Sequence, residues 1–301
     1  MLHVVIAGAS GMIGRALTAR LRGEGSDVVR LVRRAAKAPD ERSWDPDAGV
    51  LDPQAIRGAD AVVNLSGRSI AALWTATARN DILQSRVRCT RLLAEAMGKA
   101  PAPPGVLVSA SAIGYYGDRG DEILTESSPP GRGFLAEVTQ AWEIEAQRAT
   151  GSGARVVCTR FGLILAPDGG VMRVLLPIFR LGLGGPVGGG RQWWSWIHLD
   201  DVIAAIVAAI RTSTLAGAAN VVAPQPAPNR EFVQTLAAVV RRPAVLPAPA
   251  FGMRLILGQM AEEMILAGQR VSSAKLQEHG LRFRWPELRA ALEDIAGPGR
   301  R

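Results

Sequence analysis

The chain has 301 residues, 48% of them hydrophobic, with a formal net charge of +8 and a sequence pI near 10.6. This length and composition allow a large core in one or two domains, and no apolar run reaches membrane-spanning length. The positive charge is scattered and nearly all on Arg, with no basic run interleaved with aromatics. Because the charge is scattered, we expect no nucleic-acid partner. Because no apolar run could span a bilayer, we expect no membrane partner.

The cysteine content and the N-terminal residues indicate a compartment. Cys89 and Cys158 have no disulfide-framework spacing, so we expect two buried free thiols. We find no signal-peptide pattern and expect a cytoplasmic protein. Because the chain has only three His and no Cys/His cluster, we expect no metal site. The sequence carries no signal of oligomeric state.

The N-terminal stretch predicts a strand, a glycine turn, a helix and a second strand. An apolar run at 2–7 is followed by Gly8, Gly11 and Gly14, a helical pattern at 15–23 and a second apolar run at 28–32. In a dinucleotide-binding unit these glycines permit the turn, the approach of the pyrophosphate and close helix packing, respectively. The helix N-terminus then presents unpaired N–H groups to the phosphates.

Strands and helices continue to alternate along the chain. We predict strands at 60–65, 105–109, 155–161 and 219–222, and helices at 82–97, 134–150, 168–181, 202–210 and up to 295. The helix at 202–210 is expected to be capped by Asp200 or Asp201. This order predicts an α/β fold, a Rossmann doubly wound parallel sheet with a smaller C-terminal substrate lobe. The glycine-rich segment 182–190 reads as a mobile flap.

The predicted domains follow from this order of elements. A cofactor-binding Rossmann domain covers 1–166, and its sheet also takes in about 191–223. The smaller lobe covers 167–190 and 224–301.

The end of the second strand indicates which dinucleotide is bound. An NAD enzyme usually has an acidic residue there, which holds the ribose 2′-hydroxyl. This chain has Arg33 and Arg34, and a guanidinium suits the 2′-phosphate of NADP. We therefore predict NADP(H) as the cofactor.

These residues give the chain a family resemblance. It resembles the extended, NAD(P)-dependent epimerase-like branch of the short-chain dehydrogenase/reductase superfamily through GASGMIG, DAVVNLSG, VSASAIGYYGD and WSWIHLDDV. It is most similar to the atypical YfcH-like group through GFLAEVTQAWE, LPIFRLGLGGPVGGGRQWWSWIHLDD and LILAGQRVSSAKL. The segment from about 247 to 295 resembles the extra C-terminal domain of unknown function that marks this group.

The resemblance implies most of the expected cofactor contacts. Ser109 is added to them because it lies at the end of a predicted strand. The expected set is Gly8, Ser10, Gly11, Met12, Ile13, Gly14, Arg33, Leu65, Ser66, Gly67, Asp81, Ser85, Arg86, Ser109, Arg160 and Gly162. Ser111 matches the family serine that hydrogen-bonds the substrate carbonyl.

The chain departs from the superfamily at the catalytic base. Active members use a Tyr with a Lys four residues later. The Lys cation lowers the pKa of the Tyr phenol toward the working pH. Neither Tyr115 nor Tyr116 has a Lys at that spacing. With Glu143 aligned to the usual acidic residue, Leu135 and Thr139 fill the Tyr and Lys positions. A standard Tyr/Lys mechanism is therefore not expected.

Several residues remain as candidates for chemistry. Ser111, Tyr115 and Tyr116 form the candidate catalytic set, although the two tyrosines could equally pack a turn over the cofactor. Trp193, Trp196 and His198 could line a substrate pocket, or could pack the lobe. The sequence thus leaves two functions open: an NADP-dependent oxidoreductase or epimerase on a small hydroxyl or carbonyl substrate, including nucleotide-linked ones, and a non-catalytic NADP-binding sensor.

Overall fold

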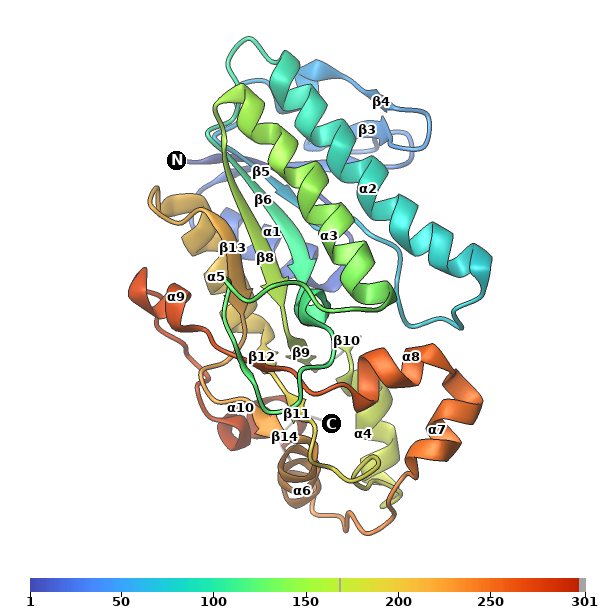
Figure 1. Cartoon of the computed structure of the whole chain (residues 1–301). Helices are drawn as coiled ribbons and strands as arrows, with labels where there is room; N and C mark the ends of the chain where they lie inside the picture. The colour runs from blue at the N-terminus through green and yellow to red at the C-terminus, as the bar shows by residue number, and fades with distance from the viewer. Residues whose placement is uncertain (168, 298–301) are drawn as a thin grey trace. The chain divides into compact units, whose positions relative to one another are not determined.

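A computed structural model describes residues 1–167 and 169–297 as parts of two compact units (Figure 1). The first unit comprises Met1–Ser111, Val138–Arg160 and Ala205–Ala219. The second comprises Ala112–Glu137, Phe161–Ala204 and Asn220–Arg301. Each unit is therefore assembled from three separate stretches of the chain.

The first unit is built on an eight-stranded sheet. Its strands lie in the order β13 (Gly217–Val221), β8 (Arg155–Phe161), β6 (Val106–Ala112), β5 (Ala61–Asn64), β1 (His3–Ala7), β2 (Asp27–Val32), β3 (Glu41–Asp45) and β4 (Val50–Leu51). β1 pairs in parallel with both β2 and β5, whereas β3 and β4 are antiparallel. The chain reverses direction across the sheet at β1, and such a switch point is where open α/β sheets bind ligands. The predicted Rossmann fold class is confirmed.

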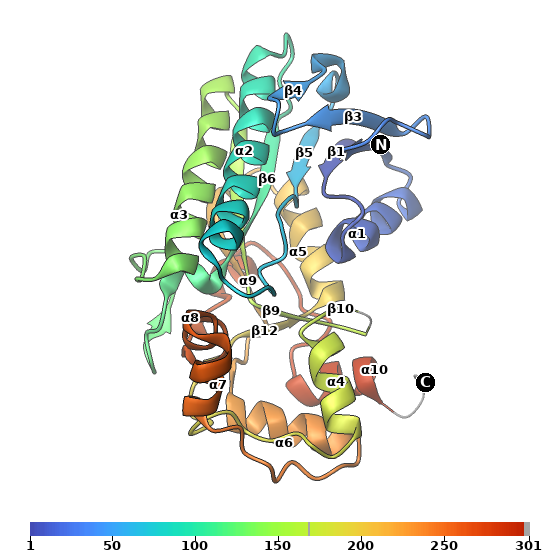
Figure 2. The same ribbon diagram turned by 90° about the vertical axis from the view of Figure 1, so that its right-hand side faces the viewer.

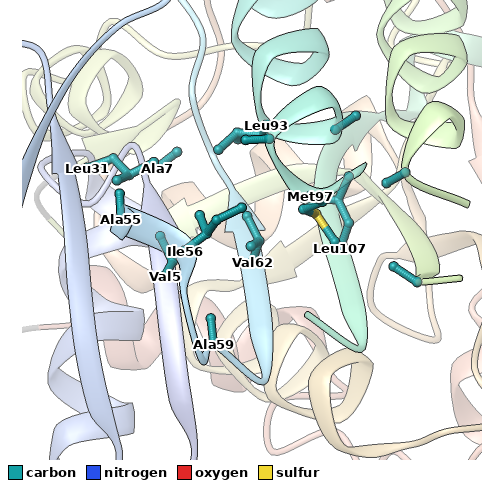
Figure 3. Close-up of a cluster of buried hydrophobic side chains, with 14 of the residues drawn as sticks. Val5, Ala7, Leu31, Ala55, Ile56, Ala59, Val62, Leu93, Met97 and Leu107 are labelled. Atoms are coloured by element: carbon teal, nitrogen blue, oxygen red, sulfur yellow. The ribbon is translucent and has the colours of Figure 1, made fainter. Parts of the chain in front are cut away.

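Helices cover both faces of this sheet. Figure 2 shows α2 (Ala76–Lys99) and α3 (Phe134–Gln147) on one face, with α1 (Met12–Gly23) and α5 (Leu199–Arg211) on the other. The short helices η1 (Pro53–Ile56) and η3 (Arg148–Ser152) complete the connections. The β-branched strand residues point into both layers, and Figure 3 shows Val5, Val62, Leu93 and Met97 within one buried cluster.

Both cysteines lie in this cluster and give a direct test of its packing. Burial raises the pKa of Cys89 to about 11 and that of Cys158 to about 12. The reactive thiolate is therefore scarce at pH 8. We expect neither thiol to react with iodoacetamide in the native protein at pH 8, and both to react in denaturant, as followed by intact mass. Fast native alkylation would show that the cluster opens.

The second unit contains three small sheets. β9 (Leu163–Ala166) joins β10 (Gly169–Gly170) and β12 (Trp196–His198), β11 (Trp193–Trp194) joins β14 (Ala227–Pro228), and β7 (Ile123–Leu124) joins β15 (Arg270–Val271). Its helical elements are η2 (Ile113–Tyr116), α4 (Met172–Arg180), α6 (Asn229–Val239), α7 (Ala250–Leu257), α8 (Gln259–Ala261), η4 (Glu262–Leu266), α9 (Ala274–Glu278) and α10 (Leu288–Ala296). Buried Trp196, Phe232 and Leu292 belong to one core cluster.

Two sequence predictions need correction here. The helix expected at 168–181 is shorter, because α4 begins at Met172, and Asp168 lies outside the described residues. The two aspartates expected to cap the helix at 202–210 lie inside it instead. Asp200 and Asp201 are in the first turn of α5, which begins at Leu199. His198 precedes this helix, and its Nδ1 accepts the Asp200 N–H over 3.1 Å.

Candidate functional site

The glycine turn forms a close crossing at the switch point of the sheet. Gly8 has φ +82°, and a Cβ there would lie 2.6 Å from the Leu65 carbonyl oxygen. A Cβ on Gly14 would lie 2.3 Å from the Gly8 oxygen, whereas at Gly11 that oxygen, 3.4 Å away, is all that a Cβ would meet. Gly8 and Gly14 thus permit the turn and the helix packing, and the open side of Gly11 leaves room for a ligand.

The N-terminus of α1 is ready to receive an anion. Gly11 is its N-cap residue, no side chain caps it, and its first turn holds no acidic residue. Ser10 is exposed, and Met12 and Ile13 are half-buried. The first N–H groups of α1 therefore point where a phosphate can accept their hydrogen bonds. These features fit a dinucleotide pyrophosphate.

The loop after β5 is held beside this turn by side chains of α2. Asp81 pairs with Arg68 over 2.7 Å, and the Ser85 hydroxyl accepts the Arg68 N–H over 3.0 Å. The Asn64 side chain accepts the Ser66 N–H over 3.1 Å. Asp81 and Ser85 thus position the loop at 65–68 in this structure. Arg68 was missed in the sequence, where nothing marks it as their partner.

The two arginines after β2 differ in their surroundings. Arg34 donates two 2.8 Å hydrogen bonds to the buried Glu41 carboxylate, and this pairing helps to lower the pKa of Glu41 to about 2. Arg33 is exposed, and no ion pair holds it among the described residues. Its charge lowers the pKa of Cys89, against the larger effect of burial. Arg33 is therefore the one of the two that is available to a 2′-phosphate.

Arg86 is a half-buried cation beside the same loop. Its guanidinium donates to the carbonyl oxygens of Arg68 (3.0 Å) and Ile82 (2.9 Å) and lies 5.0 Å from the Trp142 ring centroid. A Cβ on Gly67 would lie 3.2 Å from its Cζ atom. Burial lowers the pKa of Arg86 to about 10, and no carboxylate of the described residues pairs with it. An anionic ligand here would supply the missing countercharge.

A buried polar network lies where β6 and β8 end. The Ser111 hydroxyl donates to Glu143 Oε1 over 2.7 Å, and Arg160 donates from Nε and an η nitrogen to both Glu143 oxygens, each over 2.8 Å. The side chain of Arg160 is 4% exposed and that of Glu143 14%. The sequence offered Glu143 only as an alignment point; the network could not be read from it, because its members are far apart along the chain.

The neighbouring positions carry no titratable group that could replace the missing Tyr and Lys. Thr139, one turn before Glu143 on α3, is buried, and Leu135 carries an apolar side chain. The Ser109 hydroxyl is fully buried and donates to the Ala110 carbonyl oxygen over 3.3 Å. Ser111 is thus the hydroxyl of β6 that is joined to an acid–base partner.

The two tyrosines belong to the second unit and differ in burial. Tyr116 is fully buried, and its hydroxyl donates to Asn220 Oδ1 over 2.6 Å. Asn220 is itself fixed, because its side chain donates to the Ser272 oxygen and its N–H to Glu126. Tyr115 is half-buried and meets Tyr116 edge to face at 5.3 Å between ring centroids. This geometry favours the packing role for Tyr116 and leaves Tyr115 as the more accessible phenol.

The three residues expected in a substrate pocket also differ in burial: Trp193 lines a groove, whereas Trp196 and His198 are buried. Trp193 lines an open groove of about 870 Å³, where its indole donates to Asp121 over 2.7 Å and Arg270 lies over its ring. Trp196 is fully buried and donates to the Gln225 oxygen over 2.9 Å. His198 is also buried, bonded to Asp294 over 3.2 Å, and burial lowers its pKa. The contacts of Trp196 and His198 are those of core residues.

A Gly162 Cβ would lie 2.3 Å from the Ser195 oxygen, so this glycine permits the close approach of β9 and β12 in the second unit.

No group of three His, Cys, Asp or Glu side chains that could hold a metal ion occurs among the residues with described positions.

A glycine turn leading into an uncapped helix, at the switch point of a doubly wound sheet, defines a dinucleotide-binding protein of the Rossmann class. Residues 4–222 match the NAD dependent epimerase/dehydratase family, and residues 248–295 match DUF1731, a domain of unknown function. The chain therefore belongs to the NAD dependent epimerase/dehydratase family. The resemblance to this family and to its group with an extra C-terminal domain is confirmed.

Relatives match over nearly the whole chain. The epimerase family protein Mb2239 of Mycobacterium bovis is 41% identical over 290 residues, covering 96% of each protein. A crystal structure of human epimerase family protein SDR39U1 with NADPH has a TM-score of 0.90 and 35% identity, covering 98% of this chain and 99% of that one. A nucleoside-diphosphate sugar epimerase from Corynebacterium glutamicum has a TM-score of 0.83 and 36% identity, covering 98% of this chain and 58% of that one.

Proposed function

We propose that this protein binds NADP(H) and acts as an oxidoreductase or isomerase on a hydroxyl or carbonyl group of a small substrate. The glycine turn, the uncapped α1, Arg33 and Arg86 support the cofactor, as does the human relative crystallised with NADPH. NADP(H), when bound, supplies hydride transfer at its nicotinamide ring. Nucleotide-linked sugars are the first substrate class to test, because the Corynebacterium relative is described as a nucleoside-diphosphate sugar epimerase.

The hydrogen bond from Ser111 to Glu143 is the observation that carries the proposed chemistry. A carboxylate only accepts hydrogen bonds, so the Ser111 proton points to Glu143 and the oxygen lone pairs remain available. Ser111 in this state can accept a hydrogen bond from a substrate hydroxyl and can pass a proton toward Glu143. Arg160 holds Glu143 in place, so in this proposal Glu143 is the proton acceptor for Ser111 and Arg160 is the positioning residue behind them.

The experiment is a turnover screen of purified protein with NADPH and NADP⁺ against carbonyl, alcohol and nucleotide-sugar panels. Removing one positioned proton-transfer or hydrogen-bonding group typically costs about 10²–10³ in kcat. We expect Ser111→Ala to lose turnover by that factor while it still binds NADPH. Ser152→Ala, which removes a hydroxyl bonded to the Ala149 oxygen before β8, is the matched control and should keep activity.

Phenylalanine variants of the tyrosines locate the second proton-transfer group. Loss of turnover in Tyr115→Phe with retained folding supports Tyr115 as proton donor. Loss of folding stability in Tyr116→Phe supports a packing role, because its hydroxyl bonds Asn220 in the core. Unchanged kcat in Ser111→Ala would overturn the role of Ser111.

A second function, a non-catalytic NADP-binding sensor, has its own supporting observation. Leu135 and Thr139 stand where an active member has its Tyr and Lys. Tight NADPH binding without turnover of any substrate in the screen would favour this function over the enzyme. Turnover that depends on Ser111 would exclude it.

A further inference from the structure

One edge of the second unit exposes large apolar side chains of the kind that usually lie in a protein core. It consists of segments 171–188 and 241–258, here called the arginine-rimmed face. Val174, Leu181, Val245, Phe251, Leu255 and Ile256 on it are 61% to 85% exposed. No residue of α7 is buried. Apolar patches of this kind usually mark interaction sites.

The two segments form one continuous surface. The Gly188 N–H donates to the Ala248 oxygen over 2.9 Å, and the Ala248 N–H donates to the Pro186 oxygen over 3.0 Å. A Cβ on Gly185 would lie 1.9 Å from the Leu246 oxygen, so the backbones touch there. α4 leads into the first segment and α7 follows the second, and both helices are seen in Figure 2. Most of the glycine-rich segment 182–190, which was expected to be a mobile flap, thus forms the end of the first segment of this face.

The exposed apolar residues follow helical spacing. In α4 and the turn after it, Val174, Ile178 and Leu181 recur at intervals of four and three and therefore share one side. In α7, Phe251 and Leu255 are one turn apart and also share a side. Each helix therefore presents an apolar stripe that the described part of the chain leaves exposed.

The charges on this face are of one sign. Arg173, Arg180, Arg241, Arg242 and Arg254 are exposed, and neither segment contains an Asp or Glu. Of these five, Arg254 pairs with Glu262 just beyond the face, and the structure records no ion pair for the other four among the residues it describes. Arg241 has φ +55°, a conformation that favours glycine, so a long cationic side chain stands where glycine would be less strained.

We propose that the arginine-rimmed face binds the surface of an anionic phospholipid bilayer. Exposed Phe and Leu can enter the boundary between head groups and acyl chains while the arginines contact lipid phosphates. A second copy of the chain fits less well, because two-fold pairing of this face sets arginines against arginines. Within the described residues, no helix has the length and apolar character to cross a membrane, so the contact lies on the bilayer. The sequence expectation of no membrane partner considered spanning runs, and this face comes from two separate segments.

Flotation of the full chain with vesicles tests this proposal. We expect binding to phosphatidylcholine vesicles that contain phosphatidylglycerol, little binding to phosphatidylcholine alone, and release at high salt. The pair Arg241→Gln with Arg242→Gln, and the pair Phe251→Gln with Leu255→Gln, should each weaken binding about tenfold or more. All four side chains are exposed, so both variants should keep the fold and NADPH binding.

Matched controls lie outside the face. Ile144→Gln replaces an apolar side chain of α3 that is 63% exposed, and Arg289→Gln removes an exposed charge of α10. Both should bind vesicles like the original chain. The proposal is overturned if no vesicle binds, or if the controls lose as much binding as the face variants. A concentration-dependent dimer that Leu255→Gln dissolves, without vesicle binding, would instead assign the face to contact between copies.

Discussion

Glu143→Gln is expected to lower the free energy of unfolding by about 3–5 kcal/mol, the usual cost of leaving one partner of a buried ion pair alone. Arg160 is 4% exposed and has both Glu143 oxygens as acceptors, so it would keep a buried charge that a neutral amide cannot balance. Urea denaturation followed by circular dichroism measures the change.

Glu145→Gln is the matched control on the same helix. Glu145 is also buried, but its partners Arg91 and Arg148 are 46% and 55% exposed, so water can solvate them. We expect a loss of roughly 1 kcal/mol or less. Equal losses in the two variants would show that Arg160 is hydrated when its partner is removed. Titrating the Glu143 variant with NADPH at urea concentrations where it is still folded would show whether the substitution also affects the cofactor site or lowers stability alone.

Arg33→Gln is expected to weaken NADPH binding by roughly 10- to 100-fold and to leave NADH binding nearly unchanged. The reason is that hydrogen bonds to a charged group contribute about 1.5–3 kcal/mol, and only NADPH carries the 2′-phosphate. Titration of each nucleotide by fluorescence or calorimetry gives the two dissociation constants.

Arg34→Gln is the comparison variant, because it removes the same charge one residue later. Arg34 is already bonded twice to Glu41, so its loss should reduce stability and keep the preference for NADPH. A preference that falls in Arg34→Gln and persists in Arg33→Gln would reverse the assignment. Parallel losses of NADPH and NADH affinity in Arg33→Gln would argue against a 2′-phosphate contact.

The sequence predicted the central sheet well because its strands are apolar on both faces. The apolar runs around β1, β2, β5, β6 and β8 all become strands of one sheet. β3 was missed, since its residues ERSWD are mostly polar and bury only Glu41 and Trp44. The start of α1 was placed at residue 15 rather than Met12, because the glycine turn runs directly into the helix.

The candidate site was only partly predictable. The glycine turn is local, so its spacing could be read directly. The choice between Arg33 and Arg34 depends on Glu41, which reaches Arg34 only through the pairing of β2 with β3. The link from Ser111 to Glu143 and Arg160 depends on contacts between separate elements, and the hydrophobic pattern carries no record of such contacts.

The three-part path of the first unit sets when it can be completed during synthesis. β8 needs β13 as its neighbour, and β13 ends at Val221. Arg155 at the start of β8 donates to the carbonyl oxygens of Ala209, Ile210 and Leu215, which are made more than fifty residues later. A ribosome must therefore release most of the chain before the nucleotide-binding sheet closes. A fragment that stops before α5 would keep the glycine turn but lack the edge of its sheet.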